Sequence, residues 1–139
     1  MTPQQIALIR QSFNDLHNPE ALINEFYARL FAKAPQVRDL FPKDMTAQRK
    51  HLASALALVV NKADALHTLE KPLAEMGARH VGYGAKPEHY PVVRDVMVET
   101  IMHTLGPKGS TQIRDAWTVA LDAVASAMIK GASQNRVAA

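Results

Sequence analysis

The sequence contains no cysteine among its 139 residues. Without cysteine, a chain forms no disulfide bond, offers no thiolate to a metal or an iron–sulfur cluster, and has no cysteine nucleophile. Any metal chemistry would therefore depend on its six histidines. Five of them are spaced too irregularly for a recognisable zinc pattern: His17, His51, His67, His89 and His103.

Long apolar runs are missing as well. No stretch approaches the roughly 18 consecutive apolar residues that indicate a membrane-spanning helix. The first ten residues lack the basic region and apolar run of a secretory signal. We therefore expect a cytoplasmic protein with no membrane span.

A strong charge of one sign is also absent, because 16 basic and 13 acidic residues give a net charge of only +3. The basic residues are scattered, and the longest run of them is the pair Arg49 and Lys50. Proteins that bind a phosphate backbone usually cluster their basic residues on one face. The sequence therefore does not indicate a nucleic-acid partner.

Apolar residues recur at helical spacing along the chain, and strand-like alternation never extends beyond a few positions. The length suits one domain over residues 1–139, with the last eight or so as a loose tail. Thr2, Asn18 and Ser110 are expected to begin helices as N-cap residues. The expected helices cover 3–16, 19–33, 46–63, 67–82, about 87–105 and 110–130, with a short helical turn from Pro35. Such an all-α domain fits a globin-like packing better than a symmetric four-helix bundle.

His80 lies where an apolar helix stripe should continue. Steps of three and four residues place it on one helix face with Leu66, Leu69, Leu73 and Met76. A buried imidazole needs partners for both ring nitrogens. His80 either bonds a backbone carbonyl and a nearby hydroxyl, or ligates a metal with one nitrogen and bonds the backbone with the other. The stripe alone leaves both arrangements open.

Four short strings resemble, in order and spacing, the bacterial single-domain globins and the haem domain of flavohaemoglobins. They are FYARLFAKAPQVRDLF (26–41), RHVGYG (79–84), HYPVV (89–93) and DAWTVA (115–120). The resemblance spans nearly the whole chain. It implies a globin fold of six to eight helices around a pocket for haem b, iron protoporphyrin IX.

On the proximal side of such a haem, the resemblance implies that His80 is the iron ligand. Phe41 matches the phenylalanine that packs on the haem face, although an ordinary core aromatic would also suit its position. Tyr90 matches a tyrosine near the histidine, while the glutamate that often accompanies it is replaced by Ala132. No acidic residue follows Asp122, so this region supplies no carboxylate to strengthen the electron donation of His80.

On the distal side, Tyr27 and Gln48 match the polar pair that faces a bound gas, and Leu52 matches the neighbouring leucine. A phenol O–H or amide N–H there would donate a hydrogen bond to bound dioxygen. Gln48 would instead be an unremarkable exposed side chain if the loop before it were aligned differently. A small rotation of the same helix would aim His51 at the iron.

The resemblance implies reversible binding of dioxygen, carbon monoxide and nitric oxide, used for oxygen supply, scavenging or sensing. An enzymatic alternative is nitric oxide dioxygenation, with electrons from a separate reductase. A haem-based sensor or an electron-transfer globin is a further alternative. A haem-free helical module that binds a partner through its apolar faces remains open as well.

Overall fold

The computed structural model describes the backbone of residues 1–138 and the side chains of residues 1–133. The elements are α1 (Pro3–Asp15), α2 (Pro19–Lys33), η1 (Pro35–Leu40), α3 (Thr46–Asn61), η2 (Ala63–Leu69), α4 (Glu70–Gly82), α5 (His89–Leu105), η3 (Gly106–Lys108) and α6 (Thr111–Ala138), where η marks a 3-10 helix. No strand occurs within residues 1–138, so the all-α prediction is confirmed. Within the same range, no helix is both long and apolar enough to cross a membrane.

Three helices begin where the sequence predicted. The side chains of Thr2, Asn18 and Ser110 each accept a hydrogen bond, 3.1–3.2 Å long, from the backbone N–H three residues further on. Each bond satisfies one of the four N–H groups that a helix leaves without an internal partner at its start. These caps therefore fix the beginnings of α1, α2 and α6.

Two predicted helix boundaries differ from the structure by more than two residues. The α-helix predicted over 67–82 begins only at Glu70, because the residues up to Leu69 form the 3-10 helix η2, which is itself kinked at Ala65 (φ −147°, ψ 45°). The last helix was expected to end near residue 130, but α6 continues to Ala138. Residues 132–138, expected as a loose tail, contain neither proline nor glycine to end a helix.

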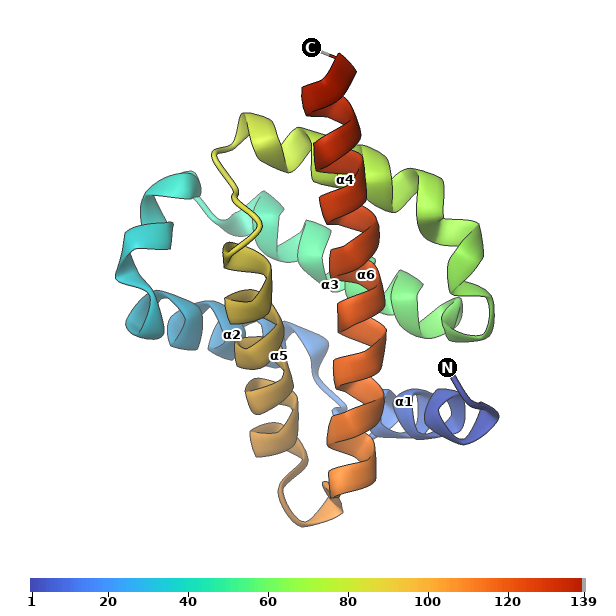
Figure 1. The fold of residues 1–139 in the computed structure, drawn as a ribbon. Coiled ribbons are helices and arrows are strands. Elements are labelled where there is room, and N and C mark those ends of the chain that lie inside the picture. Colours follow the sequence, from blue (N-terminus) through green and yellow to red (C-terminus); the bar gives the residue numbers. More distant parts are fainter. Residues whose placement is uncertain (139) are drawn as a thin grey trace.

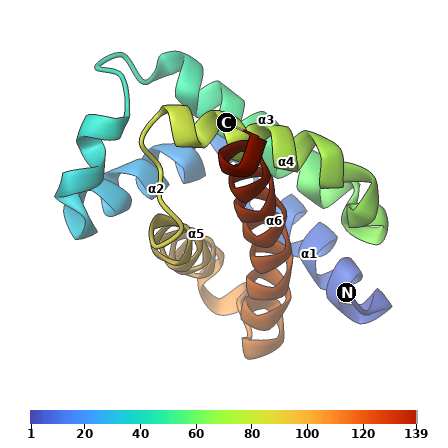
Figure 2. The same ribbon diagram turned by 45° about the horizontal axis from the view of Figure 1, so that its top comes forward.

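The helices are stacked in crossed pairs (Figures 1 and 2). α5 and α6 run antiparallel beside each other, joined by η3 (Figure 1). α2 crosses α5, α1 packs on the first half of α6, and α4 crosses the second half of α6. The main apolar core lies where α1, α2, α5 and α6 meet, with Phe26, Ile101 and Trp117 at most 2% exposed.

A buried hydrogen bond joins α1 to α6 inside this core. The indole N–H of Trp117 donates to the Ser12 hydroxyl oxygen at 2.9 Å, and that hydroxyl donates to the Ile9 carbonyl at 3.1 Å. Trp117 and Ser12 are 0% and 1% exposed. Since water cannot replace either partner there, the pair fixes how α1 sits on α6.

Ser12→Ala is expected to lower the free energy of unfolding by about 1–3 kcal/mol, because the buried indole N–H would lose its acceptor. Urea denaturation measures the change. Ser54→Ala is the matched control, since Ser54 is exposed on α3 and should change stability little. Equal stabilities of the two variants would show that the Ser12 bond contributes nothing.

Candidate functional site

His80 lies near the end of α4 and is half-buried. Its Nδ1 is 2.7 Å from the carbonyl oxygen of Met76, one helical turn earlier. A carbonyl only accepts hydrogen bonds, so Nδ1 carries a proton, and in the neutral form of the ring Nε2 presents a lone pair. No side chain of residues 1–133 forms a hydrogen bond with Nε2. The geometry fits the arrangement in which one nitrogen bonds the backbone and the other ligates a metal.

The stripe that leads to His80 packs α4 against α6. Leu69 and Leu73 are buried with Met128 of α6. Leu66, Met76 and Tyr90 pack around these three as half-buried neighbours. Tyr90, near the start of α5, thus shares a cluster with Met76 but forms no hydrogen bond with His80 within the described residues. Burial raises the pKa of the Tyr90 phenol, so the hydroxyl stays protonated at neutral pH.

Two glycines allow α4 and α6 to cross closely. A Cβ added at Gly77 would overlap the backbone of Met128, and one added at Gly131 would overlap the backbone of Ala74. The two overlaps are reciprocal, one from each helix, so any larger residue at either position would push the helices apart. The position of His80 on α4 therefore depends on these glycines, which the sequence pattern did not indicate.

Gly131→Ala is expected to lower the free energy of unfolding by about 1–3 kcal/mol, the usual cost of overpacking a close contact. Gly82→Ala is the matched control, because a Cβ at Gly82 would meet nothing within 4 Å. Urea denaturation compares the two variants. A Gly131→Ala protein as stable as the control would mean that the two helices can separate without cost.

Tyr27 and Gln48 meet across the α2–α3 contact. Tyr27 is 4% exposed, and the Gln48 amide Nε2 donates to its phenol oxygen at 3.2 Å. Because the phenol oxygen accepts this bond, its own proton is left to donate to a third group. Burial raises the pKa of Tyr27 more than the Gln48 bond and the Arg49 charge lower it, so the phenol remains a proton donor at neutral pH.

Aromatic rings surround the Tyr27 side chain. The Phe41 ring meets the Tyr27 ring edge to face at 5.7 Å between centroids, and the Phe31 ring stacks on Tyr27 at the same distance. Phe41 also contacts Phe31 edge to face at 5.4 Å. Such contacts hold aromatic rings in fixed orientations. The phenol of Tyr27 therefore has a defined direction.

The remaining residues of the predicted distal set lie on α3. Leu52, one turn after Gln48, is half-buried against the main core. His51 is exposed. The structure thus brings Tyr27, Gln48 and Phe41 into one neighbourhood, places Leu52 one turn along α3 from Gln48, and leaves His51 on the surface.

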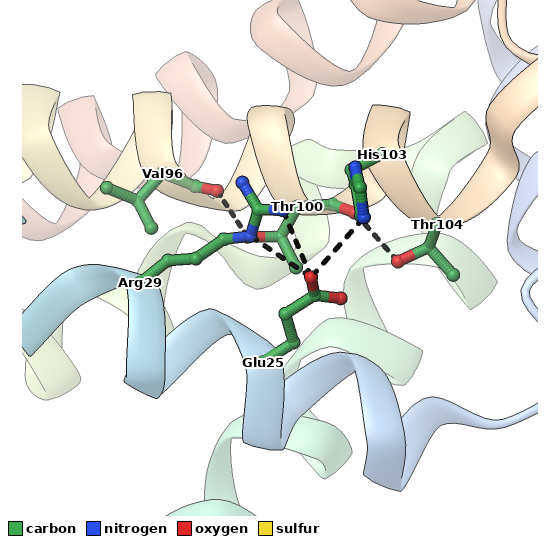
Figure 3. A network of polar contacts seen from close by, with 6 residues as sticks. All are labelled: Glu25, Arg29, Val96, Thr100, His103 and Thr104. Carbon is green, nitrogen blue, oxygen red and sulfur yellow. Dashed lines mark hydrogen bonds and ion pairs between the residues drawn. The ribbon is translucent and has the colours of Figure 1, made fainter. Parts of the chain in front are cut away.

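A group of polar contacts lies where α2, the helix that carries Tyr27, faces α5 (Figure 3). The Glu25 carboxylate lies 3.1 Å from the Arg29 guanidinium and 3.7 Å from the imidazole Nε2 of His103 on α5. In the same view, the hydroxyl of Thr100 donates to the Val96 carbonyl at 2.7 Å. Of these contacts, only the one between Glu25 and His103 joins α2 to α5; the other two each lie within one helix.

Comparison with known proteins supports the all-α fold described above. The Globin family model matches residues 24–128. A flavohemoprotein of Bacillus subtilis is 30% identical over 113 residues, 79% of this chain but only 28% of that protein. The chain thus spans about a third or less of the flavohemoproteins that it matches.

Solved structures share this fold over nearly the whole chain. A bacterial globin from Campylobacter jejuni has a TM-score of 0.83 at 28% identity, covering 96% of this chain and 97% of its own. A Rhodothermus marinus protein, a candidate nitric oxide dioxygenase engineered as a carbene transferase, has a TM-score of 0.88 at 27% identity, covering 99% and 97%. The family model matches well over half of the chain, so the chain belongs to the globin family.

Proposed function

We propose that this chain is a haem b globin that reversibly binds dioxygen and other diatomic gases, including carbon monoxide and nitric oxide. The observation that best supports this proposal is the orientation of the His80 ring. Its Nδ1 bonds the Met76 carbonyl, which leaves the lone pair of Nε2 available to a metal. A ligating histidine usually bonds the backbone through its second nitrogen in this way. Tyr27 supplies a hydrogen-bond donor that suits a polar gas.

His80 would hold the iron of the haem, while Phe41 and Leu52 would pack against its apolar surface and Tyr90 would support α4 near the ligand. When bound, haem supplies an iron atom that binds diatomic gases. The chain's own side chains would then orient the gas, and Tyr27 would donate a hydrogen bond to it. Gln48 holds the phenol oxygen of Tyr27 and so sets the direction of that donor.

Titration of the purified protein with hemin tests the proposal. One haem bound per chain is expected, with a ferrous spectrum that changes on exposure to carbon monoxide and returns when the gas is removed. A protein that binds no haem under these conditions would overturn the proposal. It would leave the haem-free helical module as the better interpretation.

A second candidate function is nitric oxide dioxygenation. It is favoured by the likeness to the Rhodothermus marinus protein and by the flavohemoprotein relatives. Reducing electrons would come from a separate reductase. Steady nitrate formation from nitric oxide and dioxygen, sustained only when a flavin reductase and its reductant are added, would establish this activity. Nitrate formation that stops after one turnover despite the reductase would exclude it.

The ferrous iron without a gas is expected to be mainly five-coordinate, because Tyr27 and Gln48 bond each other and His51 is exposed. Resonance Raman spectra report this coordination number. A six-coordinate low-spin ferrous form that disappears in His51→Ala would contradict the prediction. That result would favour an electron-transfer or sensor globin.

A further inference from the structure

An open groove of about 400 Å³ reaches from the surface to Tyr27. One wall is the face of α2 that carries Tyr27 and Phe31, and the other is made by η1, the segment that follows it, and the start of α3. Three basic side chains line this second wall: Arg38, Lys43 and Arg49. We call this hollow the Tyr27 groove.

The charges of the Tyr27 groove are mostly positive. Its only acidic lining residue is Asp44, whose carboxylate accepts a hydrogen bond at 3.0 Å from the backbone N–H of Thr46 at the start of α3. Three basic groups and one acidic group leave two positive charges in excess. Within residues 1–133, Asp44 forms no ion pair with a basic side chain, although hydrogen bonds with Thr46 and, less strongly, the charge of Arg49 lower the pKa of its carboxyl group.

Arg38 provides a fixed positive charge. Its guanidinium donates to the carbonyls of Phe41, Pro42 and Lys43 at 3.0–3.3 Å and lies 5.1 Å above the Phe31 ring. Carbonyls satisfy the N–H groups but do not cancel the charge, so the guanidinium remains a source of positive potential.

Lys43 and Arg49 provide charges that a ligand can contact. Both side chains are exposed, and neither forms an ion pair with a carboxylate among residues 1–133. The charge of Arg49 also opposes the effect of burial on the pKa of Tyr27, so its potential reaches the phenol at the inner end of the groove.

We propose that the Tyr27 groove binds small monovalent anions, such as nitrite, nitrate and azide, and raises their concentration beside Tyr27, the residue proposed for the distal side of the haem. The proposal rests on the haem site of the proposed function. Basic side chains around a hollow raise the local concentration of anions and their association rate, whereas uncharged gases are not attracted. Nitrate, the product of nitric oxide dioxygenation, belongs to the same class of anion.

Stopped-flow mixing of the ferric haem protein with azide tests the proposal. The variant Lys43→Glu/Arg49→Glu reverses the two exposed charges. Lys62→Glu/Lys71→Glu is the matched control, because it changes the net charge equally at two exposed positions outside the groove. Carbon monoxide binding to the ferrous protein serves as the uncharged reference in all three proteins.

At an ionic strength of roughly 10 mM, azide association should slow by about tenfold or more in the groove variant and by less than about twofold in the control. The difference should disappear near 1 M salt, where charges are screened within about 3 Å. Carbon monoxide association should be unchanged. Lys43→Gln/Arg49→Gln, which removes the charges without reversing them, should give an intermediate rate.

Equal azide rates in the groove variant and the control would overturn the proposal. The proposal would also be overturned if the groove variant kept the azide rate of the unmodified protein but lost its haem faster to a scavenging apoprotein. That result would show that Lys43 and Arg49 bind the carboxylates of the haem instead of anions from solution. If the chain binds no haem, the proposed function fails, but the groove can still be tested separately. Nitrate added to the haem-free, unmodified protein should then shift the amide NMR signals of residues 43–49. The same addition should not shift them in Lys43→Glu/Arg49→Glu. Identical shifts in both proteins would overturn anion binding in the groove.

Discussion

His80→Ala is expected to lose most of its tightly held haem on gel filtration, while His51→Ala and His67→Ala keep theirs. The reason is geometric: His80 is held through Nδ1 by the Met76 carbonyl, which leaves Nε2 to bind iron. His51 and His67 are exposed, and neither ring forms a hydrogen bond with a group of residues 1–133 that would fix its direction. The haem content of the eluted protein, measured by absorbance, gives the result.

His80→Gly provides a second, more specific measurement. Free imidazole should enter the space left by the side chain and restore haem binding and the ferrous spectrum. A His80→Ala protein that retains haem with an unchanged ferrous spectrum would refute the assignment of His80 as the iron ligand. Haem loss that imidazole cannot reverse would instead indicate that the substitution damaged the α4–α6 contact.

Much of the fold followed from local patterns that the sequence displays directly. N-cap side chains such as Thr2, Asn18 and Ser110 act within three residues of their own position, so their effect is visible without tertiary contacts. The apolar stripe ending at His80 also follows from helical periodicity, and Leu69 and Leu73 are indeed buried. The family itself was recognisable from four strings and is confirmed by the match over residues 24–128.

Features that depend on contacts between distant segments could not be predicted in the same way. Gly77 and Gly131 look like ordinary helix-weakening residues until α4 and α6 are brought together. Val93 has the spacing of a core residue on α5 but is 38% exposed. The Tyr27 groove likewise joins α2 to basic residues of η1, the following segment and α3. In the sequence, the basic residues that line this groove are separated from one another and do not stand out as a cluster.

The candidate haem site could be predicted only in part from the sequence. Tyr27, Gln48 and Phe41 were placed by resemblance, and their roles around a haem stay predictions. The contact between Gln48 and Tyr27 was not predicted from spacing, because it depends on how α3 packs on α2. That contact explains why one residue of the pair, Tyr27, is the better candidate for donating to a bound gas.

Tyr27→Phe is expected to weaken dioxygen binding by about ten- to a hundredfold. The phenol oxygen accepts from Gln48, so its proton is available to bound dioxygen, which is a polar acceptor. A hydrogen bond to a charged acceptor contributes about 1.5–3 kcal/mol, and about 1.4 kcal/mol corresponds to a tenfold change in an equilibrium constant. Most of the change should appear in the dissociation rate, because the lost bond stabilises the complex after it has formed.

Stopped-flow measurement of both gases separates the hydrogen bond from effects on access. Carbon monoxide is much less polar when bound, so its dissociation should change far less than that of dioxygen. Gln48→Leu is the companion variant: it removes the partner of Tyr27 but keeps the phenol, so its effect on dioxygen should be smaller. Equal changes for both gases in Tyr27→Phe would indicate that the ring acts as a steric gate. An unchanged dioxygen dissociation rate would transfer the donor role to Gln48, because its amide would then be free to turn from the missing hydroxyl towards the gas.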